Sequence, residues 1–227
     1  MKEDAWRTAE ELMAQLARDP EYAKRRQADE QTRQTKVAQN MRDAQPVVDN
    51  LAAQGLSIQT IADLFNNKLN YKAAIPTLLE WLPRVSNPEV KEDIVRALSV
   101  IWAKPSAIEP LLVEFERADD SGLRWAVANG LAVVADDSAF SRISDWLRDP
   151  RYGNAREMLA VALGNMRDPR AFDLLIELLK DEEIVGHAAI GLGNFGDSRA
   201  KSPLEGLRDH RKKWVRDEAR TALRKLR

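Results

Sequence analysis

The chain alternates between apolar stripes with helical spacing and short polar turns. Within a stripe, apolar residues stand three and four positions apart, which is the spacing of one face of an α-helix. Two such stripes contain Ile75, Leu78, Leu79 and Leu82, and Ile108, Leu111, Leu112 and Phe115. A turn rich in Asp, Asn, Pro or Gly follows each one, and a second stripe begins after it. The pattern predicts an all-α protein made of helix pairs, with Asn87 and Ser121 as N-caps.

A leucine recurs at one position in the second helix of each pair. Its occurrences are Leu98, Leu131, Leu163, Leu192 and Leu223, at spacings of 33, 32, 29 and 31 residues. An Ala or Gly precedes each of them, and a small residue there lets neighbouring helices approach closely. Because one pair cannot bury its apolar faces alone, the pairs are expected to stack into a continuous core. The pattern predicts five pairs, at residues 73–102, 106–135, 138–167, 170–196 and 199–227.

The third and fourth pairs carry the most regular repeat. Residues 162–171 read Ala-Leu-Gly-Asn-Met-Arg-Asp-Pro-Arg-Ala, and residues 191–200 align with them without a gap. With the segment Leu174–Asp181, these stretches resemble the HEAT-like repeats of the phycobilisome-lyase type, over about residues 73–227. The resemblance implies an α–α superhelix, a HEAT-repeat solenoid that binds proteins along its concave face. It implies no particular reaction, because one fold supports many functions.

The first 72 residues differ from the repeats and are predicted to form an N-terminal helical cap, with the solenoid at residues 73–227. Residues 5–17 carry an apolar face that includes Trp6, and Asp19 with Pro20 begins a second helix. That helix is almost purely polar from Arg25 to Asp43, and Pro46 is expected to kink or split it. Residues 45–70 suit a cap for the repeats. Residues 21–44 fit either the cap or an arm for a partner or a dimer.

Charge is distributed unevenly although the net charge is −1. Residues 201–227 hold ten Lys and Arg against four acids, whereas residues 70–200 hold 15 basic and 21 acidic residues. The basic end suits either a solvated last helix, whose cations complement the helix dipole, or a nucleic-acid patch. The chain shows no apolar leader and no membrane-spanning run, so we expect a cytoplasmic protein that does not enter the membrane.

Candidate chemistry is sparse. The chain has no cysteine and two histidines, His187 and His210, which excludes disulfides, thiolate zinc sites and Cys nucleophiles. It has no His-Glu dipeptide, so it does not match the HEAT-repeat di-iron hydroxylases, and no Gly-rich phosphate loop. The acidic pairs Asp119-Asp120 and Asp136-Asp137 lie in turns, where Asp is favoured for capping. The sequence therefore predicts a non-enzymatic protein with no cofactor and no metal.

The recurring leucine sets a register in which equivalent positions of the second helices can be compared. The candidate partner-binding residues in this register are Lys91, Glu92, Arg124, Trp125, Asn129, Arg156, Glu157 and Arg216. Trp125 is off the apolar stripe, so it is predicted to be either an exposed hot spot or a wedge between repeats. The arginines have a structural alternative, an inter-repeat ladder with turn acids, as in Asp149 with Arg156.

The sequence thus predicts a module that binds another protein on the concave face, centred on the second and third pairs. The alternative is a nucleic-acid binder, or a repair protein like the alkylpurine DNA glycosylases, that uses the basic C-terminal end. An acidic solenoid body disfavours that alternative, because DNA affinity depends on neutralising phosphates. Bilin lyase activity and an immunity or antitoxin role remain further possibilities with no residue that supports them.

Overall fold

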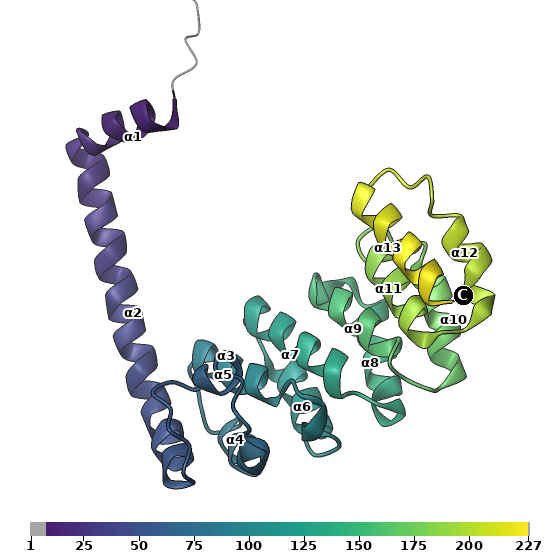
Figure 1. Cartoon of the computed structure of the whole chain (residues 1–227), viewed down its shortest axis with the longest axis horizontal. Helices are drawn as coiled ribbons and strands as arrows, with labels where there is room; N and C mark the ends of the chain where they lie inside the picture. The colour runs from purple at the N-terminus through teal and green to yellow at the C-terminus, as the bar shows by residue number, and fades with distance from the viewer. Residues whose placement is uncertain (1–7, 227) are drawn as a thin grey trace, which may run out of the picture. The chain divides into compact units, whose positions relative to one another are not determined.

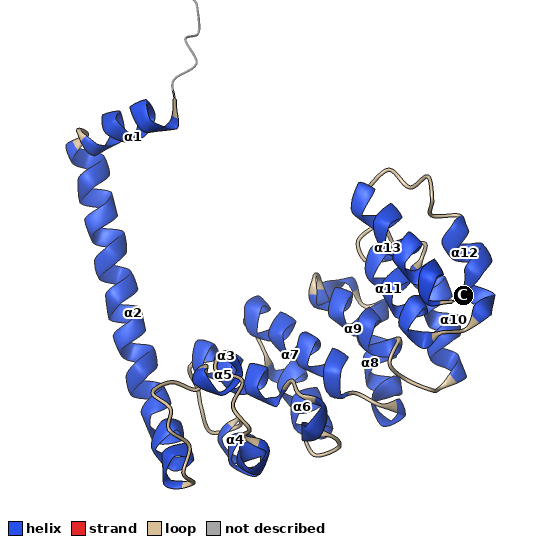
Figure 2. Ribbon diagram, in the orientation of Figure 1, coloured by secondary structure: helices blue, strands red, loops and turns tan. Residues whose placement is uncertain are grey.

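The computed structural model describes residues 8–226, and all regular structure in this range is helical. The chain divides into two compact units, residues 1–45 and residues 46–227, which are considered separately. Figure 1 shows the order of the helices, and Figure 2 shows the loops that join them. An all-α fold is confirmed for the described residues.

The first unit consists of helix α1 (Ala9–Ala17) and most of helix α2 (Pro20–Ala53). The predicted start of α2 is confirmed, because Asp19 Oδ1 accepts the backbone N–H of Glu21 at 2.9 Å. The polar part of α2 carries ion pairs along its own surface, such as Arg33 with Glu30 at 2.8 Å. Trp6, which was placed on the first helical face, lies outside the described residues.

Helix α2 contains Pro46 and runs as one helix from Pro20 to Ala53, so of the two predicted effects of Pro46, a kink or a split, the split is wrong. Pro46 deprives the helix of one N–H donor. The next turn buries Val47, Val48 and Leu51 in the core of the second unit, and this burial compensates for the missing hydrogen bond. Gly55 follows with φ +88°, as expected of a residue that ends a helix.

The second unit begins with residues 46–53 of α2 and a short helix α3 (Asp63–Asn66). Leu64 of this helix and Ile61, two residues before it, are buried. These residues belong to the same compact unit as the repeats, which is what a cap requires. The boundary at residue 72 between cap and solenoid stays a prediction.

Five helix pairs follow, in the predicted places. They are α4 (Ile75–Trp81) with α5 (Pro88–Leu98), α6 (Ile108–Arg117) with α7 (Ser121–Val134), α8 (Phe140–Arg148) with α9 (Ala155–Leu163), α10 (Pro169–Leu178) with α11 (Val185–Phe195), and α12 (Lys201–Glu205) with α13 (Lys213–Lys225). We call the first helix of each pair outer and the second inner. Each inner helix packs on the next, and Figure 1 shows the inner helices as one layer of the second unit.

The recurring leucines form the core between inner helices. Leu98, Leu131, Leu163 and Leu192 are fully buried, whereas Leu223 on the last helix is half-buried. The small residues act as predicted. A β-carbon added at Gly191, the small residue before Leu192, would lie 2.7 Å from the backbone oxygen of Ala160. One added at Gly164 would lie 2.4 Å from the backbone oxygen of Gly191, so α9 and α11 touch backbone to backbone. Only glycine fits such an approach.

The turns hold the pairs in register. Asn87 caps α5 as predicted, but Asp120 rather than Ser121 caps α7, because its Oδ1 accepts the N–H of Leu123 at 2.8 Å. Ser121 is the first residue inside the helix. One residue earlier, a carboxylate reaches the free N–H groups of the first turn more directly than the Ser hydroxyl would.

A second turn motif joins the fourth and fifth helix pairs each to the preceding repeat. Asp168 and Asp197 cap their own turns and hold Arg170 and Arg199 in forked hydrogen bonds. These two guanidinium groups lie over the rings of Phe140 and Phe172, one repeat earlier, at 4.4 and 4.3 Å from the ring centres. The aspartate thus aims the arginine at a ring of the neighbouring repeat.

Candidate partner-binding surface

The four predicted basic residues at the start of the inner helices are engaged inside the solenoid. Lys91 on α5 pairs with Glu114 of the next repeat at 2.5 Å, and Glu114 is only 3% exposed. Arg124 on α7 donates to the carbonyl oxygen of Ala118 and lies 5.7 Å from the ring centre of Tyr152. Lys91 thus links its inner helix to the next repeat, and Arg124 links its inner helix to the end of the preceding outer helix.

Arg156 is the most deeply placed of the four, with 4% of its side chain exposed. It donates to the Leu147 carbonyl at 2.8 Å, to Asp181 at 2.5 Å and to Glu183 at 3.4 Å. The two carboxylates belong to the turn of the following repeat, so Arg156 makes an inter-repeat ladder. Arg216 on α13 likewise donates to a backbone carbonyl, that of His210, at 2.6 Å.

The acidic residues of this inter-repeat ladder are not the ones that the sequence predicted. Asp149, seven residues before Arg156, pairs with Arg151 at 2.6 Å instead. The reason is proximity along the chain, because Asp149 also caps the 3₁₀ turn Pro150–Tyr152 and the Arg151 side chain starts beside it. Arg156 is left to reach forward to the next turn.

The remaining predicted residues lie on the inner helices with varied exposure. Glu92 pairs with Arg96 on the same helix at 2.5 Å. Trp125 and Asn129 on α7 are half-buried, so Trp125 is less exposed than a free-standing hot spot would be. The described tryptophans with the most exposed side chains are Trp102 and Trp214, at 41% and 40%. Glu157 on α9 is one-third exposed and faces the neighbouring helix.

Around Glu157 the structure brings together a cluster that the sequence reasoning missed. We call Glu157, His187, Trp214 and Glu218 the inner cluster; they come from the consecutive inner helices α9, α11 and α13. Glu157 Oε2 lies 3.9 Å from His187 Nε2, and the His187 and Trp214 rings lie 5.2 Å apart between centres. A β-carbon at Gly186 would lie 2.0 Å from the Trp214 ring, so this glycine makes room for the indole.

The electrostatics of the inner cluster are negative. Burial lowers the pKa of His187, while the carboxylates of Glu157 and Glu218 raise it, and burial prevails. His187 is therefore neutral near pH 7, and its Nδ1 is buried without a hydrogen-bond partner among the described residues. Two carboxylates and an exposed indole remain at the surface. The sequence held one signal of this site. In the leucine register, Gly186 is the glycine at a position that the other inner helices fill with Glu92, Trp125, Glu157 and Asp217.

Three of the basic residues at the C-terminal end, Arg211, Lys213 and Arg220, form ion pairs in the described part of the chain. Arg211 binds Glu182 at 2.9 Å, and Asp217 takes both Lys213 at 2.6 Å and Arg220 at 2.8 Å. Ion pairing of this kind leaves fewer cations free for phosphate groups than the sequence count suggests.

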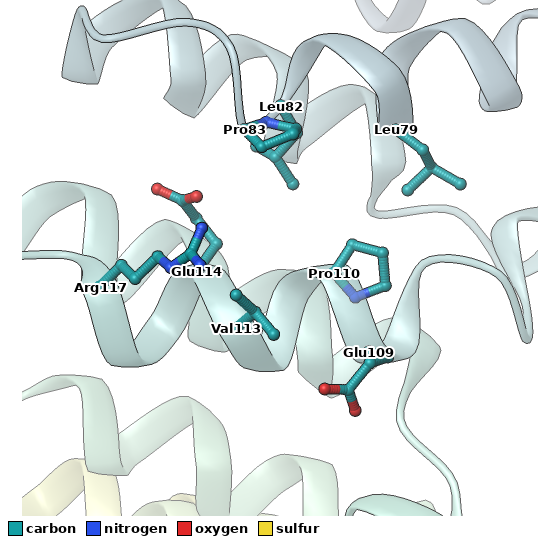
Figure 3. A pocket seen from close by; sticks show the side chains of 8 residues that line it. All are labelled: Leu79, Leu82, Pro83, Glu109, Pro110, Val113, Glu114 and Arg117. Atoms are coloured by element: carbon teal, nitrogen blue, oxygen red, sulfur yellow. The ribbon is translucent and has the colours of Figure 1, made fainter.

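The outer layer has a small groove between α4 and α6, drawn in Figure 3. It encloses about 280 Å³ and is lined by Leu79, Leu82, Pro83, Glu109, Pro110, Val113, Glu114 and Arg117. Across residues 8–226, no three His, Asp or Glu side chains gather closely enough to hold a metal ion. Within the same range, no helix has the length and apolar character needed to cross a membrane.

Stacked helix pairs with one continuous core define an α-solenoid. The profile of the HEAT-repeat family matches residues 108–185 and 153–224, which together span half of the sequence. The chain therefore belongs to the HEAT-repeat family. Its fold is one that typically serves as a protein-interaction scaffold.

Among solved structures, the chain is similar to a designed armadillo repeat protein, YIII(Dq)4CqI. The two are 19% identical with a TM-score of 0.48, over 74% of this chain and 86% of the other. No curated protein matches the sequence.

Proposed function

We propose that the solenoid binds a partner protein on the surface of its inner helices, through the inner cluster and the neighbouring Trp125. The partner is proposed to present Lys or Arg side chains there. The role is recognition without catalysis, in the cytoplasm. One observation carries the proposal. The predicted cations of this surface bind groups of the solenoid itself, whereas the side chains of Glu157, Glu218 and Trp214 are at least partly exposed to a partner.

The chemistry of the inner cluster supports a cationic partner. An indole face attracts an ammonium or guanidinium group, and a flanking carboxylate strengthens the attraction. Trp214 is held against Gly186, so little conformational freedom is lost when a ligand stacks on it. Tryptophan in a central position is also the residue type most enriched among binding hot spots.

This proposal moves the centre of the predicted site. Of the eight predicted residues, the basic ones Lys91, Arg124, Arg156 and Arg216 become supports of the surface. Glu157 and Trp125 remain proposed contacts, and the site extends towards α13. Glu92 on α5 and Asn129 on α7, both partly exposed, are proposed to form its rim.

The test is affinity capture from the native cell with the full chain as bait and quantitative mass spectrometry as readout. The double variant Glu157→Gln with Trp214→Ala removes one carboxylate and the indole. Glu205→Gln, on the exposed surface of outer helix α12, is the matched control. We expect specific partners to be lost at least tenfold with the double variant and retained with the control. If every specific partner stays bound to the double variant, the proposal is wrong.

A direct measurement separates this proposal from nucleic-acid binding. The captured partner is titrated into the wild-type chain at increasing salt, alongside duplex DNA. A basic partner protein that binds while DNA does not supports the proposal. Salt-dependent DNA binding that survives the double variant contradicts it, because phosphate contacts need cations elsewhere.

A further inference from the structure

The groove between α4 and α6 has the composition of a docking site for an apolar side chain. Leu79, Leu82 and Pro83 form one wall and Pro110 and Val113 form the other, as Figure 3 shows. Leu79 and Val113 are only half-buried, so apolar surface remains open to an occupant. At about 280 Å³, the groove is smaller than the sites that hold drug-sized ligands and suits one or two side chains.

Three charged residues line the groove, and the two acidic ones already pair with cations outside it. Glu114 pairs with Lys91 at 2.5 Å, and Glu109 pairs with Arg142 at 2.9 Å. Arg117 is exposed and makes no hydrogen bond or ion pair with any residue of the described range. Its neighbour Glu116 also binds Arg142, at 3.0 Å. Among the charged residues that line the groove, Arg117 is therefore the one whose charged group has no partner within residues 8–226, and it lies at the end opposite Glu109 (Figure 3).

The spacing along α6 sets the length of a matching segment. Pro110, Val113 and Arg117 stand at positions i, i+3 and i+7, on one face of the helix. Seven residues of α-helix rise about 10 Å. An extended peptide advances about 3.3 Å per residue, so three residues cover the same distance. A side chain seated beside Pro110 is thus about three residues away from one that meets Arg117.

We propose that this groove docks a short extended segment of another protein that carries an apolar side chain and, three residues from it, an Asp or Glu. The apolar side chain fills the space between Leu79, Pro110 and Val113. The carboxylate forms a forked pair with the Arg117 guanidinium. The site is on the outer helices, so it stands or fails independently of binding at the inner cluster.

The probes are capped octapeptides of Gly and Ser with one Leu, in which a single Glu stands one to five positions from the Leu on either side. Each is titrated into the full chain labelled at its methyl groups, and the NMR shifts of Leu79, Leu82 and Val113 are followed. We expect saturable shifts confined to these methyls, with the tightest binding at a spacing of three. A parallel series with Lys in place of Glu is expected to bind at least tenfold more weakly.

Charge reversal makes the test specific for Arg117. The variant Arg117→Glu should reverse the preference, so that the Lys peptide with the same spacing binds better than the Glu peptide. Arg148→Glu is the matched control, because Arg148 is likewise the last residue of its outer helix and should change neither series. Affinity that does not depend on spacing, or that Arg117→Glu leaves unchanged, would overturn the proposal. Circular dichroism is used to check that both variants are folded.

Discussion

Replacing Arg156 by Met tests whether this residue supports the solenoid. Met keeps most of the side-chain volume and removes the guanidinium. The change leaves the buried Leu147 carbonyl without its donor, which costs about 1–3 kcal/mol. It also removes the partner of Asp181, whose side chain is 29% exposed, so water replaces part of that interaction. We expect a total loss of about 3 kcal/mol, at the lower end of the range for a fully buried pair.

Urea unfolding followed by circular dichroism and a thermal melt measure this loss. For a chain of this size, about 3 kcal/mol lowers Tm by about 6–12 °C. Arg148→Met is the control, because Arg148 is half-exposed and lies 3.7 Å from an exposed Glu177. Its replacement should cost less than about 0.5 kcal/mol. If the two variants are equally stable, Arg156 is not a structural residue and the assignment of the ladder is wrong.

The same variant has a predicted pH signature. Burial raises the pKa of Asp181, but hydrogen bonds from Arg156 and from backbone N–H groups outweigh it and lower the pKa below its usual value. A carboxyl whose pKa is lower in the folded state stabilises the fold above its unfolded pKa, near 3.9. That stabilisation is lost as pH falls through the folded value. The stability difference between wild type and Arg156→Met should therefore narrow below about pH 4.

Three further changes probe other contacts. Gly164→Ala places a methyl group 2.4 Å from the Gly191 backbone oxygen and should destabilise the fold by about 2 kcal/mol or more in urea unfolding; equal stability would mean that the helices can move apart. Glu114→Gln, which strips the charge from the buried partner of Lys91, should cost about 2–4 kcal/mol by the same measurement, and no change would show the pair to be dispensable. Arg170→Ala uncovers the phenyl ring one repeat earlier and should lower Tm by less than Arg156→Met does; a larger drop would contradict the exposed geometry.

The helix pairs could be predicted because their determinants lie close together in sequence. The spacing of Leu98, Leu131, Leu163 and Leu192 reports a position that every inner helix buries. The small residue before each leucine reports a close approach of neighbouring helices, which the structure shows for Gly191 against the backbone of Ala160. Local rules of this kind need no knowledge of how the repeats are offset from one another.

The candidate site could be predicted only in part, because its contacts cross repeats. Whether Arg156 binds Asp149 or Asp181 depends on the offset between successive repeats, and Arg151 competes for the nearer acid. The empty position at Gly186 was visible in the sequence. Its occupant, the indole of Trp214, comes from a helix 28 residues further along the chain and is brought there by stacking alone.

The paired stacks of Arg170 on Phe140 and Arg199 on Phe172 bear on how this protein can change in length. Each stack joins a turn to a phenyl ring of the preceding repeat through the same arginine–ring contact. Excising residues 141–172 would join Phe140 to Asp173 and leave Arg199 the same 27 residues from a phenyl ring as before. The junction would therefore reuse an existing interface. A gene encoding such a chain can lose or duplicate one repeat in a single recombination event without having to evolve a new interface between repeats.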